Sequence, residues 1–84
     1  MSYCYEDHRG FVFTEDGQVM FLRIRDRAKA LIAASGAATC GCIIATSTGD
    51  SWHMLACVDR LVELGELHEV PNPRSSAGQD RIFT

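Results

Sequence analysis

The chain has 84 residues, enough for a single domain with a core of its own. A hydrophobic content of 46% and a charged content of 23% are those of a folded domain and argue against disorder. The net charge of −3 does not favour nucleic acid or an anionic membrane as the partner, because both repel a negative protein unless its positive charges cluster.

The first 13 residues are predicted to be an N-terminal arm that precedes a domain of residues 14–84. Residues 1–9 are polar, with early acidic side chains and no apolar stretch typical of a signal peptide, so we expect a cytoplasmic protein. The arm ends in Phe11, Val12 and Phe13, a short apolar run that suits a strand or a packed extension. The longest uncharged stretch, 30–49, contains too many helix breakers and weakly apolar residues to span a membrane.

The strongest helical pattern covers residues 15–35. Thr14 can cap this helix, and Glu15 and Asp16 place negative charge in its first turn, where the helix dipole favours it. Gly36 ends the helix as a C-cap glycine would. At about 100° per residue, one face of the helix carries Met20, Phe21, Ile24, Ala28, Leu31, Ile32 and Ser35.

Two further helices are predicted. A short one follows Thr39 as its cap and directs Ile43 and Ile44 to the core. Residues 46–50 form a turn, and Asp50 or Ser51 then caps a third helix over about 51–64, which Gly65 ends. The apolar face of this third helix carries Met54, Leu55, Val58, Leu61 and Val62.

The pattern changes after Gly65. Residues 66–70 and 79–84 are strand candidates, and the polar loop 71–78 between them contains two prolines and a glycine. Two strands around such a loop predict a β-hairpin at the end of this sequence.

The order helix, helix, turn, helix, hairpin resembles the winged helix-turn-helix superfamily. Residues 58–67 carry the likeness. The apolar end of the helix has leucines three residues apart, Leu61 and Leu64, and Gly65 follows directly, with Leu67 two residues later. The resemblance implies a mainly α, α+β fold of three helices with a C-terminal hairpin as the wing. Winged helices bind DNA most often, whereas others bind RNA, proteins or their own copies, so the fold does not fix the function.

The charge distribution weighs against DNA. DNA-binding members insert the third helix into the major groove and need cations there and on the wing. Residues 50–84 hold three basic and six acidic side chains. The outward face predicted for the third helix carries Trp52, His53, Ala56, Arg60 and Glu63. A nucleic-acid surface would have to be assembled from Arg60, Arg74 and Arg81, joined by Arg23 and Arg27 of the first helix.

Apolar side chains outside the predicted core indicate a protein partner instead. Val19 and Leu22 lie away from the core face of the first helix, where either the arm covers them with Phe11 and Phe13 or a second subunit does. Trp52 on the third helix is either a partly buried anchor or an interface hot spot. The candidate protein-interaction residues are Val19, Leu22, Trp52, His53 and Arg60.

The sequence offers four candidate metal ligands: Cys40, Cys42, His53 and Cys57. His53 and Cys57 share a helix face, but Cys40 and Cys42 point about 200° apart if they are helical. We therefore expect small buried cysteines, no metal and no cofactor, with a metal or redox sensor as a further alternative. No catalytic constellation is predicted. The sequence favours a non-enzymatic regulatory or accessory module that binds a protein or forms a homodimer with its own copy, with a DNA-binding transcription regulator as the alternative.

Overall fold

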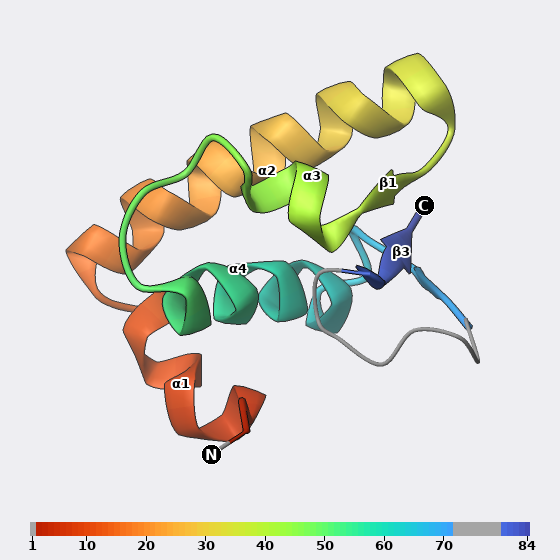
Figure 1. Cartoon of the computed structure of the whole chain (residues 1–84). Coiled ribbons are helices and arrows are strands. Elements are labelled where there is room, and N and C mark those ends of the chain that lie inside the picture. Colours follow the sequence, from red (N-terminus) through yellow and green to blue (C-terminus); the bar gives the residue numbers. More distant parts are fainter. Residues whose placement is uncertain (1, 72–79) are drawn as a thin grey trace.

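The computed structural model describes residues 2–71 and 80–84, and within them four helices surround one core (Figure 1). The helices are α1 (Tyr5–Val12), α2 (Glu15–Ser35), α3 (Cys40–Ile44) and α4 (Ser51–Glu63). The central helix α4 lies between α1 on one side and α2 on the other. The described part of the chain is therefore a mainly helical α+β domain.

The predicted boundaries of α2 are confirmed. The Thr14 hydroxyl accepts a hydrogen bond from the Gly17 N–H at 3.0 Å, which caps one of the free donors of the first turn. At the other end Gly36 adopts a left-handed conformation with φ 82°, and its N–H donates to the Ile32 carbonyl.

The two predicted helices that follow are also confirmed. Thr39 caps α3 by accepting from the Cys42 N–H at 3.2 Å. Asp50 rather than Ser51 caps α4, with its carboxylate accepting from the Trp52 N–H at 2.8 Å. Gly65, with φ 78°, follows α4 and turns the chain so that Leu67 enters the core.

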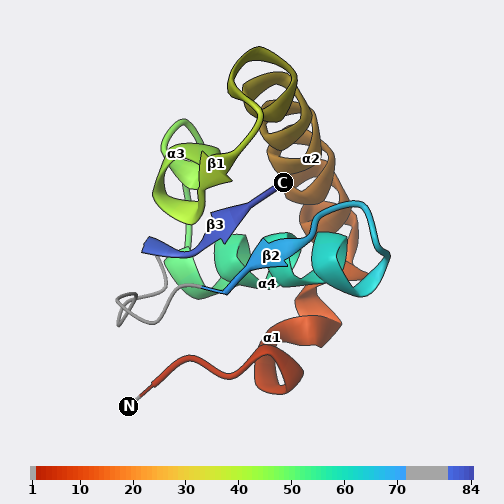
Figure 2. The same cartoon turned by 90° about the vertical axis from the view of Figure 1, so that its right-hand side faces the viewer.

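A small antiparallel sheet closes one end of the molecule (Figure 2). Its strands are β1 (Ala38–Thr39), β2 (Glu69–Val70) and β3 (Ile82–Phe83), in the order β1-β3-β2. The pairing of β2 with β3 confirms the predicted hairpin, with shorter strands than expected. Strand β1 was not predicted. The predicted loop lies outside the described residues, apart from residue 71.

The N-terminal arm is an extension packed on the domain, but its predicted apolar run is not a strand. Residues 5–12 form the helix α1, with Glu6 and Asp7 in the first turn and Arg9 in the last, as the helix dipole favours. Helix α1 packs against α4 and α2, and Val12 is fully buried at the junction. A helix of eight residues is too short to be stable alone in water, so the packing of α1 against α4 and α2 stabilises it.

The core brings together the apolar faces of the helices and the sheet. Phe21, Ile24 and Ala28 of α2 and Met54, Val58 and Leu61 of α4 are buried as predicted. Each fully buried large side chain contributes about 1.5–3 kcal/mol relative to an exposed one. The largest of them are Phe83, Ile24, Ile43, Leu61 and Leu67. Among the described helices, none is long and apolar enough to cross a membrane.

Candidate interaction surfaces

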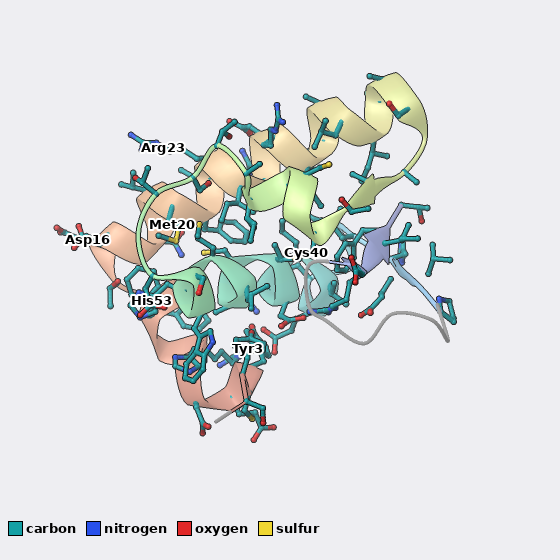
Figure 3. The ribbon with its side chains drawn as sticks, in the orientation of Figure 1. Tyr3, Asp16, Met20, Arg23, Cys40 and His53 are labelled. Carbon is teal, nitrogen blue, oxygen red and sulfur yellow. The ribbon has the colours of Figure 1, made fainter. Side chains whose placement is uncertain are left out.

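The face of α4 that was predicted to point outward is covered by α1. Ala56 is completely buried, and the ring of Phe11 stacks on His53 with 3.7 Å between centroids. The rings of His8 and Trp52 lie edge to face, with 4.9 Å between their centroids. The prediction of an exposed face was therefore wrong for Ala56, and Trp52 and His53 are only partly accessible. His53 lies near the N-terminal end of α4, above α1 (Figure 3).

Hydrogen bonds to two carboxylates of α4 hold α1 and the residues before it in place. The Tyr3 hydroxyl donates to Asp59 Oδ2 at 2.7 Å, and the Tyr5 hydroxyl donates to Glu63 Oε1 at 2.9 Å. Arg9 Nε donates to both oxygens of Glu63 at 3.1 and 3.2 Å. We call these five residues the α1 clamp. Sequence reasoning missed this group, since its members lie more than 50 positions apart in pairs and no local pattern links them.

Glu63 is the most heavily bonded carboxylate of the clamp. It also accepts from Arg60 Nη1 at 2.6 Å. Hydrogen bonds from Arg60, Arg9 and Tyr5, in that order, lower the pKa of Glu63 to about 2. Burial and the hydrogen bond to Glu63 raise the pKa of Tyr5 to about 12. The clamp is therefore ionised at Glu63 and protonated at Tyr5 across the physiological range.

Two of the five candidate nucleic-acid arginines, Arg60 and Arg81, are paired with carboxylates. Arg81 Nη2 lies 2.7 Å from Asp59 Oδ1 and 2.8 Å from Glu69 Oε1, and these contacts raise the pKa of Arg81, the hydrogen bond to Glu69 most. Arg60 is bonded to Glu63, and its guanidinium also lies over the ring of Phe13. Arg74 lies outside the described residues.

The other two candidate nucleic-acid residues contact different parts of the fold. Arg27 Nε donates to the Cys42 carbonyl at 3.4 Å, a long bond to α3. Arg23 lies beside Ser47 and Thr48 of the loop that precedes α4. Each of the four described candidate arginines thus contacts its own group of neighbours.

Two exposed apolar side chains lie on α2, as the sequence predicted. Val19 is 53% exposed and Leu22 is 44% exposed. The expectation that the arm covers them with Phe11 and Phe13 is wrong, because Phe11 stacks on His53 and Phe13 lies under Arg9 and Arg60. We call Val19 and Leu22 the α2 patch.

A shallow depression borders the α2 patch. It has a volume of about 130 Å³ and is lined by Asp16, Val19, Met20, Arg23, Ser47 and Thr48. Asp16 and Arg23 point away from α2 toward solvent, whereas Met20 points toward α4 (Figure 3). Binding pockets for drug-sized molecules are typically about 300–1,000 Å³ and more enclosed, so the depression suits a protruding side chain better than a free ligand.

The candidate metal ligands are divided between the core and the surface. Cys40 and Cys57 are buried, and burial raises the pKa of both thiols to about 11, so both are protonated at neutral pH. Cys42 is exposed on the same short helix as Cys40, so the expectation of a buried cysteine is wrong at this position. Within residues 2–71 and 80–84, no three His, Cys, Asp or Glu side chains come together in a group that could hold a metal ion.

Comparisons of the chain with protein-family models, with curated proteins and with solved structures found no significant match.

Proposed function

We propose that this chain is a winged helix-turn-helix module with a regulatory or accessory role, which binds a protein and performs no catalysis. The order of α2, α3 and α4 followed by the β2–β3 hairpin supports the winged-helix assignment. So does the turn at Gly65, which reverses the chain directly after α4 and brings Leu67 into the core beside Leu61.

The observation that carries the proposal is the position of α1. In a DNA-binding winged helix the third helix of the motif, here α4, must enter the major groove. Helix α1 of the same chain already covers that face of α4, because Phe11 stacks on His53 and Ala56 is buried.

The pairing of the arginines supports the same conclusion. Binding to DNA gains free energy when cations displace the counterions of phosphates. Arg60 and Arg81 already neutralise Glu63, Asp59 and Glu69 of their own chain. Contact with phosphate would require these pairs to break or would place the carboxylates close to the phosphate backbone.

Two measurements test the proposal. The first is an electrophoretic mobility shift with random-sequence duplexes at about 50 mM salt, where phosphate contacts are strongest. We expect no retardation. Retardation that weakens with salt and with Arg60→Ala, Arg74→Ala or Arg81→Ala would contradict the proposal and favour a transcription regulator.

The second measurement is protein binding with purified components. A partner identified by capture is titrated against the full chain by calorimetry, with Leu22→Glu as the interface variant. The control is Val70→Glu, which changes an exposed apolar side chain of β2. We expect a stoichiometric complex. Leu22→Glu should weaken this complex, and Val70→Glu should retain it. Binding of duplex DNA without any protein complex would refute the assignment.

A further inference from the structure

Helix α1 lies at the edge of the molecule and covers a face of α4 that α2 does not reach (Figure 1). Of the eight described residues of α1, only Val12 is buried, next to the connection with α2. The other seven are half-buried or exposed. A helix of this length is unstable alone in water, so these contacts decide whether α1 stays in place.

The polar contacts between α1 and α4 are exposed. The side chains of Arg9 and Glu63 are 43% and 37% exposed, and the hydrogen bond from Tyr5 to Glu63 is exposed as well. Exposed ion pairs contribute little net free energy, because water competes for both partners and salt screens them. The part of the α1 clamp that lies on α1 itself can therefore open at little cost.

Both carboxylates of the α1 clamp keep a cation when α1 leaves. Asp59 lies 2.7 Å from the guanidinium of Arg81, and Glu63 lies 2.6 Å from that of Arg60. A carboxylate left without partners in a half-buried position would be costly. Because Arg60 and Arg81 belong to other elements than α1, its opening avoids this cost.

The connection between α1 and α2 contains one hinge residue. Phe13 has φ −90° and ψ 1°, in the region beside the helical one, whereas Thr14 is extended with φ −82° and ψ 164°. Rotation about ψ of Thr14 would swing α1 away from α4 without breaking a backbone hydrogen bond inside either helix. The bond from Gln18 Nε2 to the Val12 carbonyl at 2.6 Å favours the closed angle.

Opening of α1 would uncover a surface that suits a helix. Trp52, Ala56, Asp59 and Glu63 follow one another at intervals of four, three and four residues, so they form one stripe along α4. We call these four residues the α4 stripe. Its first half is apolar and its second half is acidic.

The charges around the acidic half leave an excess of one carboxylate. Three carboxylates share two guanidiniums within the described residues outside α1, namely Asp59, Glu63 and Glu69 with Arg60 and Arg81. In the closed form Arg9 of α1 supplies the third cation. The uncovered stripe therefore favours a basic helix and disfavours the phosphates of DNA.

The contacts of α1 indicate which helix fits the α4 stripe. Phe11 stacks on His53 beside the apolar half, and Arg9 donates to both oxygens of Glu63 in the acidic half. A helix of another protein that carries an arginine and an aromatic side chain at this spacing can make the same two contacts.

We infer that α1 is a hinged lid, which opens about Thr14 and competes for the α4 stripe with an arginine- and aromatic-bearing helix of a partner protein. The inference goes beyond the proposed function, because it adds a regulated surface on α4 to the α2 patch. It rests on the proposed function in taking the occupant of the stripe to be a protein.

Thiol labelling of Ala56→Cys tests the opening of the lid. Ala56 and Cys57 are both completely buried, but only Ala56 belongs to the α4 stripe. In the native protein, iodoacetamide should modify the thiol introduced by Ala56→Cys about tenfold faster than Cys57, as located by tandem mass spectrometry. The added substitutions Tyr5→Phe and Arg9→Ala should accelerate this reaction about fivefold further.

The matched control is Glu6→Gln, which changes an exposed side chain of α1 and should leave both rates as they are. Deuterium uptake of the unmodified chain gives a second measurement that does not depend on Ala56→Cys. The amides of α1 should exchange well before those of Val58 and Leu61. Equal labelling rates at the two thiols, or equal protection of α1 and α4, would overturn the lid.

A synthetic peptide of residues 2–13, with a fluorophore at its N-terminus, stands in for the partner helix. It is titrated by anisotropy against the full chain up to about 1 mM, the effective concentration typical of a tethered segment. We expect saturable binding to the double variant Tyr5→Phe/Arg9→Ala and about tenfold weaker binding to the wild type, because the closed lid competes. A peptide with Arg9→Ala and Phe11→Ala should bind neither protein.

Absence of saturable binding to the double variant would overturn the docking of a helix on the α4 stripe. Equal affinities of the double variant and the wild type would overturn the competition. These failures leave the proposed function intact, because the α2 patch does not depend on the lid. Retardation of duplex DNA by the double variant would instead refute both the proposed function and the assignment of a protein helix to the stripe.

Discussion

Arg81 donates a hydrogen bond of 2.7 Å to Asp59, which joins the start of β3 to the last turns of α4. Both side chains are largely buried, with exposures of 20% for Arg81 and 14% for Asp59. Asp59 also accepts from the Tyr3 hydroxyl, so this one carboxylate links the sheet, the central helix and the N-terminal segment.

Asp59→Asn is expected to lower the free energy of unfolding by about 2 kcal/mol, because hydrogen bonds to charged groups contribute about 1.5–3 kcal/mol. Glu69→Gln should cost less than about 1 kcal/mol, because Glu69 bonds Arg81 from a more exposed position. Urea unfolding followed by circular dichroism measures both. Equal effects of the two substitutions would contradict the central role of Asp59.

Gly17 lies where α1 meets α2 and leaves no room for a side chain. A Cβ at this position would come within 1.9 Å of the Phe11 carbonyl oxygen, a backbone atom that cannot move without shifting the end of α1. Gly17→Ala should destabilise the protein by about 1–3 kcal/mol or more. Gly10→Ala is the matched control, because its Cβ meets nothing within 4 Å. There alanine should stabilise α1 by about 0.5–1 kcal/mol. Thermal unfolding of the two variants should therefore change in opposite directions.

Acid should weaken the α1 clamp through Glu63. The pKa of Glu63 is about 2 in the folded protein, below its ordinary value of 4.5, because Arg60, Arg9 and Tyr5 bond the carboxylate. A lowered pKa gives stability that is complete above pH 4.5 and is lost as the pH falls toward 2. The difference between the unfolding midpoints of the wild type and Glu63→Gln should shrink as the pH falls from 4.5 toward 2. A difference that stays constant with pH would show that the ionised carboxylate does not contribute.

Alkylation should divide the cysteines into two classes. Cys4 and Cys42 are exposed, whereas Cys40 and Cys57 are buried with their pKa raised to about 11, so few thiolates form there at neutral pH. Iodoacetamide should add to two cysteines of the native protein and to all four in denaturant, as counted by mass spectrometry. Rapid labelling of Cys57 in the native protein would contradict the packing of α4.

The long helices could be predicted from the sequence because their signals are local. For α2, a cap at Thr14, acidic residues in the first turn and Gly36 at the end agree with the apolar periodicity. The same agreement holds for α4, with Asp50 before it and Gly65 after it. The exposure of Val19 and Leu22 followed from the same periodicity.

Helix α1 and strand β1 could not be predicted because distant partners stabilise them. Helix α1 bonds Glu63 through Tyr5 and Arg9, and Tyr3 before it bonds Asp59, so its partners lie far away in sequence. Strand β1 has only two residues, too few to show an alternating pattern, and it pairs with Ile82 and Phe83. The wrong assignment of Ala56 follows from the missing α1. One signal was available, since Trp52, His53 and Ala56 extend the apolar surface of α4 beyond what one partner helix would cover.

Because β3 is the middle strand, the sheet loses both of its strand pairings when β3 detaches. Among the strands of residues 2–71 and 80–84, β1 and β2 do not pair with each other, and each pairs with β3. The Cys40 N–H donates to the Arg81 carbonyl on one side, and Thr84 exchanges two hydrogen bonds with His68 on the other. Detachment of β3 would therefore release amide hydrogens at both places to solvent in a single event. Their deuterium uptake should rise in step, although 28 positions separate Cys40 from His68 along the chain.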